Sequence, residues 1–422
     1  MSVTRRITFR LYPNRTQLRQ LQEWRRLHCL LYNGALANRK TQYQRFNNSV
    51  DYFEQQNCLP KFKEFWPEYK PLGSHALQST LKRVDLAFNR FFSGLSKYPK
   101  FKSSRYYRGW SYPCNAGWRA LTEGKNGHLK LSNLGSIRMR GTARTWGKPS
   151  TCTIIWKSST NQWFASITVR CNPERELGKG AVGIDFGVLT AAALSDGTKI
   201  DNPRFLKNGL ETIKLISKQL RKKRRPEKRK VKASRRWKQT KKRIAKIHGK
   251  IAQKRQDWTH KVAVQITSDN SMIATEKLNL KGLTAKAKRG KRKRQKTGLN
   301  RSILDVGIGM LKSSIQYKIE EGNGIYTEIP TKKVKPSQTC PACGHQKKKE
   351  LSEREHNCHC GFQADRDIAA AMVIINYARG LEQASSDCRE TSSEPIPVYC
   401  GGLAKLGSLK RRKLPPSSRR GE

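Results

Sequence analysis

Acidic residues are scarce in this sequence. Of 422 residues only 31 are Asp or Glu, against 87 Lys or Arg, which gives a formal net charge of +56. Such an excess of positive charge repels itself unless an anionic partner neutralises it, so the composition favours a protein that binds nucleic acid. A cationic membrane-surface protein would concentrate its charge on amphipathic helices, whereas these basic residues are spread over nearly the whole chain.

Long apolar runs are also missing. No segment approaches the ~20 apolar residues that a membrane span requires, and the N-terminal MSVTRRITFRLYP has no apolar stretch typical of a signal peptide. No G-x-x-x-x-G-K-[ST] phosphate loop is present, so NTP hydrolysis is not supported. Of eleven cysteines, four form one tight cluster, which fits a reduced compartment and a metal. We therefore expect an intracellular, cytoplasmic protein without a membrane partner.

The hydrophobic pattern changes along the chain. Alternation predicts strands at residues 3–11, 128–140 and 151–170, which we expect to form a small β-barrel. Between the first two, helical spacing begins near residue 16 and recurs at Leu77, Leu81, Val84, Phe88 and Phe91. These observations indicate helices inserted into an N-terminal barrel.

After the polar linker NPERELGKG, strands alternate with helices. We expect strands in AVGIDFGVLTAAAL, SMIATEKL and 324–329, basic helices over 210–265 broken near Pro226, and one helix over 301–321. Residues 286–296 are too charged to bury anything and predict a mobile loop. Alternating strands and helices argue for an α/β domain. The Ser/Pro-rich, basic tail after residue 382 is expected to be disordered.

The segment TCPACGHQKKKELSEREHNCHCGF predicts a metal site. It contains two close cysteine pairs, each followed by Gly and separated by fourteen residues: Cys340, Cys343, Cys358 and Cys360. This spacing is typical of a zinc ribbon with structural Zn²⁺, and it fits a metal better than a redox pair. The second pair is Cys-x-Cys where two intervening residues are usual, and the adjacent His356 and His359 could replace one sulfur.

Three acids are candidate catalytic residues. Asp185 follows an apolar strand in VGIDFG, Glu276 ends the strand of MIATEKL, and Asp367 begins a helix in ADRDIAAAMVI. Taken singly, each acid is explained more simply by a salt bridge or a helix cap, and Asp365 and Asp367 especially by N-terminal capping. Three acids on separate elements of one domain would converge only around a divalent cation. Carboxylate oxygens suit Mg²⁺ or Mn²⁺, and two such ions ~4 Å apart can hydrolyse a phosphodiester, so the pattern predicts a metal-dependent nuclease.

The motifs, in their order, resemble a known family. The segments GIDFG, TEKLNLKGL, LNRSILD, SQTCPACG, NCHCGF and ADRDIAAAMVI, with FRLYPNRTQ, AFNRFFSGL and YPKFKSSR before them, are similar to TnpB, the transposon-associated ancestor of the type V CRISPR nucleases. The resemblance covers nearly the whole chain. It implies an α+β multidomain protein: an RNase H-like (RuvC) α/β nuclease domain with an inserted zinc ribbon, plus an N-terminal β-barrel interrupted by a helical recognition domain. Asp185, Glu276 and Asp367 would be the metal ligands and catalytic residues of that nuclease.

The resemblance also implies a domain map. Residues 1–12 and 98–175 would form the barrel, 13–97 the helical domain, 176–338 and 362–381 the nuclease domain, 339–361 the zinc ribbon, and 382–422 the tail. The expected partners are a guide RNA transcribed from the transposon end and a target double-stranded DNA, cut next to a short adjacent motif, with one protein per RNA. The RNA dependence follows from the resemblance alone.

Nucleic-acid contacts are expected in two kinds of segment. Basic helices at 210–255 would grip backbone phosphates while base pairing reads the target. The mixed basic and aromatic segment from residue 98 has the composition of a base-stacking surface, and the polar helix face around Gln78 could reach base edges. The candidate contacts are Gln78, Lys82, Lys100 and Lys102.

Three rival functions remain. A nuclease-inactive, RNA-guided repressor would be expected to lose one or more of the acids, and all three are present. A non-catalytic zinc-ribbon protein that binds nucleic acid explains the charge and the cysteines but not the acids. A strand-joining transposase would need an HUH-and-tyrosine arrangement, which the sequence does not offer.

Overall fold

The structure, a computed structural model, describes residues 3–225, 233–286, 290, 292–350 and 353–390. The chain divides into two compact units, one ending at Pro173 and the other beginning at Glu174. In the part of the chain that is described, no helix combines the length and the apolarity needed to cross a membrane.

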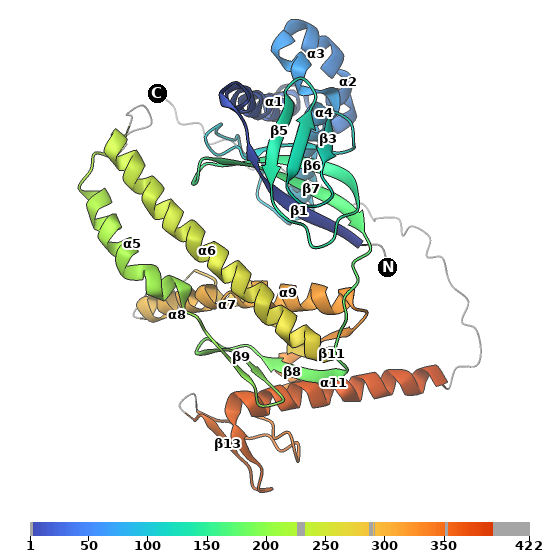
Figure 1. The fold of residues 1–422 in the computed structure, drawn as a ribbon, viewed down its shortest axis with the longest axis vertical. Coiled ribbons are helices and arrows are strands. Elements are labelled where there is room, and N and C mark those ends of the chain that lie inside the picture. The colour runs from blue at the N-terminus through green and yellow to red at the C-terminus, as the bar shows by residue number, and fades with distance from the viewer. Residues whose placement is uncertain (1–2, 226–232, 287–289, 291, 351–352, 391–422) are drawn as a thin grey trace. The chain divides into compact units, whose positions relative to one another are not determined.

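The N-terminal unit is built on a nearly closed, barrel-like sheet of seven strands (Figure 1). Its order is β2-β6-β7-β1-β5-β4-β3, and every neighbouring pair is antiparallel. The strands are β1 (Val3–Tyr12), β2 (Gly109–Tyr112), β3 (Trp118–Leu121), β4 (Gly127–Leu131), β5 (Gly135–Arg140), β6 (Lys148–Lys157) and β7 (Gln162–Cys171). Alternation sends Phe9 and Leu11 into the core while Arg10 stays exposed. The expected small barrel, assembled with the N-terminal strand, is confirmed as this nearly closed sheet.

Helices inserted between β1 and β2 complete this unit. They are α1 (Arg15–Phe46), α2 (Tyr52–Asn57), α3 (Leu59–Phe65), the 3₁₀ helix η1 (Pro67–Leu72) and α4 (Ser74–Phe92). A capping box of Asn14 and Gln17 begins α1. On α4 the predicted stripe is buried at Leu77, Leu81 and Val84, but its last members pack on Tyr98 and remain partly accessible, because the helix ends there.

The second unit is organised around a five-stranded sheet with the order β10-β9-β8-β11-β12. Its strands are β8 (Gly180–Asp185), β9 (Thr190–Leu194), β10 (Lys199–Asp201), β11 (Asn270–Glu276) and β12 (Ile325–Ile329). β8, β11 and β12 run parallel, and β9 and β10 are antiparallel additions at one edge. The sheet is the one expected of an α/β domain, and the predicted α+β multidomain class is confirmed.

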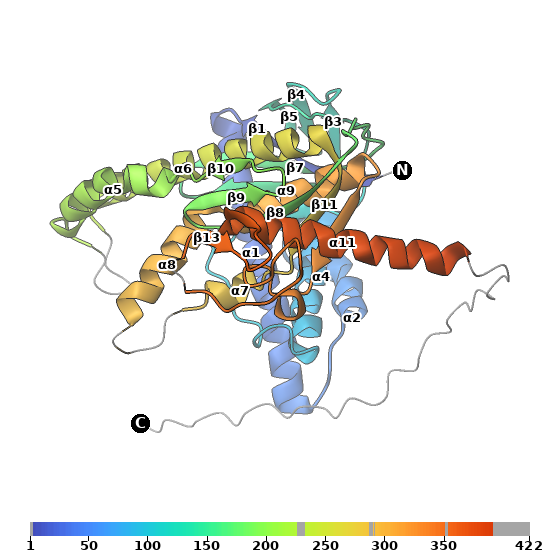
Figure 2. The ribbon, with the colours of Figure 1, turned by 90° about the horizontal axis from the view of Figure 1, so that it is seen from below.

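Helices cover both faces of this sheet. The helices are α5 (Phe205–Arg221), α6 (Arg235–Asp269), α7 (Leu280–Leu283), α8 (Lys293–Val306), α9 (Ile308–Glu321), α10 (Thr331–Val334) and α11 (Arg366–Glu390). Ile184 and Ile273 pack with residues of α6 and α9, whereas Ala274 packs with Val373 and Ile374 of α11 on the other face. Figure 2 shows α11 crossing in front of the sheet. Side chains that alternate along β8 and β11 therefore face different helices.

Three expectations about the second unit need correction. The single helix expected over 301–321 is two helices, α8 and α9, because the chain turns at Gly307, whose φ is 77°. Within the charged segment 286–296, α8 already begins at Lys293, and residues 287–289 and 291 lie outside the described part. The tail expected from residue 382 begins as helix, since α11 extends to Glu390; residues 391–422 and the region around Pro226 lie outside the described residues.

Candidate functional site: a carboxylate cluster and a cysteine cluster

Two of the candidate acids end adjacent parallel strands. The ladder between β8 and β11 finishes at the pair Thr275–Ile184, so Asp185 and Glu276 are the next residues on the two strands. Both alternate with residues that face α6 and α9, and they therefore point to the α11 face. The carboxyl ends of parallel strands bring the two acids to the same edge of the sheet.

The third acid is brought there by a close approach of helix to strand. A Cβ added to Gly183 would lie 2.0 Å from the carbonyl oxygen of Ala371 and 2.9 Å from the amide nitrogen of Ile375. Only glycine allows the backbone of α11 to lie this close to β8. Asp367 is in the first turn of α11, about one helical turn before Ala371. The contact at Gly183 thus fixes the start of α11 beside Asp185.

Asp365 and Asp367 have different roles at this helix start. The Asp365 carboxylate accepts the backbone amides of Asp367 at 3.0 Å and Ile368 at 3.4 Å, and it pairs with Lys199 at 2.6 Å. Asp365 is therefore the N-terminal cap, as one reading of the sequence expected. The Asp367 carboxylate instead interacts with Asp185.

The electrostatics of the cluster are those of uncompensated acids. Burial, followed by the charges of Glu276 and Asp367, raises the pKa of Asp185 to about 7, against an opposing effect of Arg366. Burial also raises the pKa of Glu276, opposed by the nearby Lys312. In the described chain none of the three carboxylates has an ion-pair partner within 4.0 Å. Because the three carboxylates repel one another and none is paired with a cationic side chain, a bound metal cation would stabilise the cluster.

The oxygen donors fit a hard divalent cation such as Mg²⁺. As a set they are more widely spaced than the cysteines: in the part of the chain described, only the cysteine cluster brings three or more ligand atoms of His, Cys, Asp or Glu all within 4.8 Å of one another. A cation that keeps several waters tolerates such spacing, because water fills the remaining positions.

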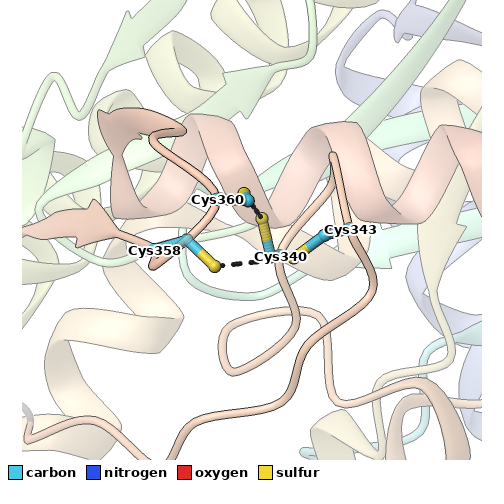
Figure 3. Close-up of side chains that lie close together, drawn as sticks. All are labelled: Cys340, Cys343, Cys358 and Cys360. Carbon is cyan, nitrogen blue, oxygen red and sulfur yellow. Dashed lines mark hydrogen bonds between the residues drawn. The ribbon is translucent and has the colours of Figure 1, made fainter.

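The four predicted zinc ligands do come together (Figure 3). The Sγ atoms of Cys340 and Cys360 are 3.7 Å apart, and those of Cys343 and Cys358 are 3.5 Å apart. Four sulfurs around a tetrahedral zinc at about 2.3 Å would be about 3.8 Å from one another, so the cluster fits Zn²⁺. The amide of Cys360 lowers the pKa of the Cys358 thiol, whereas the pKa of Cys343 in the same cluster is raised. Cys358 is therefore the sulfur that most readily becomes the thiolate that binds metal.

The two knuckles are built alike despite their different spacing. Gly344 donates its amide to the carbonyl of Cys340, and Gly361 donates to that of Cys358, both at 3.0 Å. Both glycines have a positive φ, 73° and 86°, which a residue with a Cβ rarely adopts. The shortened second pair therefore still makes a tight turn. The knuckles continue into a two-stranded sheet of β13 (Glu355–Asn357) and β14 (Gln363–Asp365).

Neither histidine displaces a cysteine from the cluster. His356 is buried, packs against Phe362 and hydrogen-bonds Lys349. His359 Nδ1 lies 3.6 Å from the Cys358 sulfur and its ring packs edge-on against His345. Since all four sulfurs already converge, the histidines are neighbours of the site.

The candidate nucleic-acid contacts lie in the N-terminal unit. Lys82 pairs with Asp85 at 3.0 Å and lies over the Tyr52 ring. The Lys102 ammonium lies 3.9 Å from the centroid of Tyr32, and Lys100 is exposed on the same segment. Gln78 is half-buried on α4. The contacts of the two lysines with partners, Lys82 and Lys102, are with other residues of the N-terminal unit.

Two residues near the acids had not been singled out from the sequence. The ammonium of Lys312 on α9 reaches the carbonyl oxygen of Glu276 at 2.6 Å. Gly183 provides the close approach of α11. The sequence offered two signals for these residues. Lys312 is a lone lysine in the apolar run GIGMLKSSI, and Gly183 stands two residues before the acid in VGIDFG.

Three family models match separate segments of the chain. A family model described as "Probable transposase", of the OrfB_IS605 type, matches residues 164–287; a "Cas12f1-like, TNB domain" matches 309–374; and a "Helix-turn-helix domain" of the OrfB_IS605 type matches 1–48. The chain is 29% identical over 380 residues to "Putative RNA-guided DNA endonuclease InsQ" of Escherichia coli K12, covering 87% of this chain and 90% of that protein. Over most of its length the chain is therefore similar to proteins of the TnpB family.

A second relative and a solved structure are also similar to this chain over most of its length. "Putative RNA-guided DNA endonuclease" of Streptomyces pristinaespiralis is 29% identical over 397 residues, which cover 92% of this chain and 91% of the relative. The structure of a Cas12f1–sgRNA–target DNA complex matches with a TM-score of 0.53 at 12% identity, over 89% of this chain and 99% of the Cas12f1 chain, which supports the fold. The region matched as helix-turn-helix is, in this structure, strand β1 followed by the continuous helix α1.

Proposed function

We propose that the protein is an RNA-guided endonuclease that cleaves double-stranded DNA next to a short transposon-adjacent motif. The relatives of Escherichia coli and Streptomyces pristinaespiralis carry the name RNA-guided DNA endonuclease and align over most of the chain. The observation that carries the proposal is the approach of Asp185, Glu276 and Asp367 without a paired cation. A net charge of +56 provides the affinity for a polyanion.

In this proposal the three acids hold Mg²⁺ or Mn²⁺ and form one RuvC-like site. Such ions supply an activated water and stabilise the leaving oxygen during phosphodiester hydrolysis. Asp185 and Glu276 would be held by the two parallel strands, and Asp367 by the contact of α11 with Gly183. The chain's part is to keep three carboxylates together on rigid elements, facing the same side.

The cysteine cluster would hold structural Zn²⁺. Between β12 and α11 the regular structure of the described residues is the one-turn helix α10 and the two short strands β13 and β14. A metal would therefore replace the apolar core that so small a segment cannot build. The zinc ribbon leads directly into α11, which carries Asp367. Folding of the ribbon would therefore help to place the third acid.

The guide RNA and the target DNA would contact both units. We propose the domain boundaries given by the family resemblance, with base pairing reading the target and the protein holding the backbone. Gln78, Lys82, Lys100 and Lys102 remain our candidates for nucleic-acid contacts in the N-terminal unit. The basic helices α5 and α6 are candidates for backbone contacts in the second.

The test is cleavage by the purified complex. The protein is co-expressed with the RNA of its own locus, and the complex is offered a plasmid library with randomised flanks next to the guide-matched target. Mg²⁺-dependent cutting beside one enriched flank, abolished by Asp185→Ala with RNA binding retained, is the expected result. Cutting that persists unchanged in Asp185→Ala would refute the site, and RNA-directed binding without cutting by the unaltered protein would favour the repressor.

A further inference from the structure

Lys312 is a buried lysine aimed at the end of β11. Its side chain is 11% exposed. The ammonium donates to the carbonyl oxygen of Glu276 at 2.6 Å and pairs with the Glu328 carboxylate on β12 at 3.1 Å. Ordering a long cationic side chain in the interior is costly unless each of its bonds is used. Both partners lie where the strand carrying a proposed metal ligand ends.

The carbonyl that Lys312 binds lies beyond the last residue pair of the β8–β11 ladder, although Glu276 itself still pairs with Ile329 of β12. The ladder between β8 and β11 ends at Thr275–Ile184, and the next amide on the β12 side, that of Lys277, already donates to Ile329. The Glu276 carbonyl accepts instead from the amide of Leu278, at 3.0 Å, and from Lys312. A buried carbonyl requires a hydrogen-bond donor. Here the Lys312 side chain of α9 provides that donor, just beyond the end of the β8–β11 ladder.

Lys312 approaches from the face opposite to the acids. Thr275 pairs in register with Glu328 and faces α6 and α9, whereas Glu276 alternates to the α11 face. The lysine therefore holds the backbone of the ligand residue from behind, with its charge balanced by Glu328, and leaves the Glu276 carboxylate free of an ion pair within the described chain. Such support by neighbours is the usual means of orienting a metal ligand.

We propose that Lys312 is a positioning residue, which fixes the Glu276 carboxylate relative to Asp185 by anchoring the Glu276 carbonyl. The proposal deepens the proposed function and rests on the same metal site. The direction in which metal affinity changes when Lys312 is replaced distinguishes this role from a purely electrostatic one. A nearby ammonium repels a divalent cation, so loss of charge alone would tighten metal binding, whereas loss of positioning weakens it.

The test measures Mn²⁺ binding to the purified protein–RNA complex by electron paramagnetic resonance, with cleavage as a second readout. Lys312→Met, which keeps an unbranched apolar side chain but removes the donor, is expected to weaken Mn²⁺ binding at least 10-fold and to raise the half-maximal Mg²⁺ for cleavage similarly. Lys312→Arg should restore most of the affinity, because it keeps a charged donor. Glu328→Gln, which leaves the carbonyl bond in place, should stay within about threefold of wild type.

Two controls keep the outcomes distinct. Asp185→Ala should abolish Mn²⁺ binding, which identifies the site being measured. If Lys312→Met does not fold, judged by its melting curve, Lys312→Gln carries the same expected loss, because its amide is one bond too short to reach. Unchanged or tighter Mn²⁺ binding in the folded Met or Gln variant would overturn the positioning role. Asp185-dependent Mn²⁺ binding without any DNA cleavage would defeat the proposed function and leave the positioning role standing.

Discussion

The Cβ that Gly183 lacks would lie 2.0 Å from the carbonyl oxygen of Ala371. No L-residue other than glycine fits there unless α11 moves away from β8, because the obstacle is backbone. Gly183→Ala is therefore expected to destabilise the protein by about 1–3 kcal/mol and to reduce cleavage by at least ~100-fold, since Asp367 moves with the helix. Urea denaturation and plasmid cleavage by the RNA complex measure the two effects.

The matched control for this change is Gly298→Ala. Gly298 lies on α8 of the same unit with nothing within 4 Å of its added Cβ and no positive φ, so alanine should stabilise the helix by about 0.5–1 kcal/mol. Normal cleavage by Gly183→Ala would show that the close contact does not position Asp367.

A second prediction concerns pH in the absence of added Mg²⁺. Burial, Glu276 and Asp367 raise the pKa of Asp185 to about 7, against about 3.9 in an unfolded chain. Between these values the folded state holds a proton that the unfolded state has released, so the free energy of unfolding falls as pH rises from about 4 to about 7. Since the side chain is half-buried, we expect a contribution on the order of 2 kcal/mol.

Asp185→Asn isolates this effect, because asparagine does not titrate. The unfolding free energy of the variant relative to wild type should increase from pH 5 to pH 8 in magnesium-free buffer. Added Mg²⁺ should stabilise wild type more at pH 8 than at pH 5, because the ion binds the ionised carboxylate. A variant-to-wild-type difference that does not change with pH would contradict the raised pKa.

Zinc content gives a third prediction. Cys340→Ser removes one of four sulfurs that converge within 4.8 Å, and the purified variant should lose its bound zinc and melt at a lower temperature. His359→Ala should keep zinc, because the ring is a neighbour of the cluster. Cys58→Ser, at an exposed free cysteine of the N-terminal unit, is the control for general thiol loss. Elemental analysis by mass spectrometry measures the content, and zinc lost from His359→Ala would mean that this histidine is a ligand.

Local signals in the sequence were sufficient for most of the fold. Alternation predicted β1, short apolar runs predicted β8 and β11, and the cysteine spacing predicted the cluster. Each of these signals lies within a few residues and depends on local geometry. The α8–α9 break was missed, since one glycine inside a helical pattern does not by itself end a helix.

Contacts between distant segments could not be read from the sequence. Lys312 lies 36 residues from Glu276, and nothing nearby in the chain marks it as a partner of that carbonyl. The distinction between Asp365 and Asp367 also depended on the structure, because both residues stand where a helix cap would be expected. The acids could be named as candidates, but their neighbours could not.

The motif LNRSILD supported the family resemblance without a role for its last residue, and the structure gives it one. The Asp305 carboxylate accepts the amides of Leu206 and Lys207 at the start of α5, at 2.8 to 3.2 Å, and pairs with Arg255 of α6 at 2.8 Å. It thereby joins three helices of the second unit. A buried acid of this kind stabilises the fold chiefly because, without it, the buried groups that donate to it would have no hydrogen-bond acceptor.

Asp305→Ala is accordingly expected to destabilise the protein by about 3 kcal/mol, because Nη2 of Arg255 and two backbone amides lose the carboxylate that accepts their hydrogen bonds. Asp305→Asn keeps an acceptor oxygen and should cost about half as much. Urea denaturation at constant Mg²⁺ measures both. Equal losses in the two variants would indicate that the charge, rather than the hydrogen bonding, is what matters.

Asp365 and Asp367 offer a matched pair two residues apart at the start of α11. Asp367→Asn should reduce Mg²⁺-dependent cleavage by at least ~100-fold, because a proposed metal ligand loses its charge. Without metal its melting temperature should be unchanged or higher, since a carboxylate that repels Asp185 is gone. Asp365→Asn should do the reverse. It keeps an oxygen to cap the helix but loses the ion pair with Lys199, so stability falls by about 0.5–1 kcal/mol and cleavage stays within about threefold. Plasmid cleavage and thermal melting on both variants decide the matter: a catalytic loss that follows Asp365 would exchange the two assignments, and equal losses in both variants would mean that the helix start, rather than one carboxylate, is what cleavage requires.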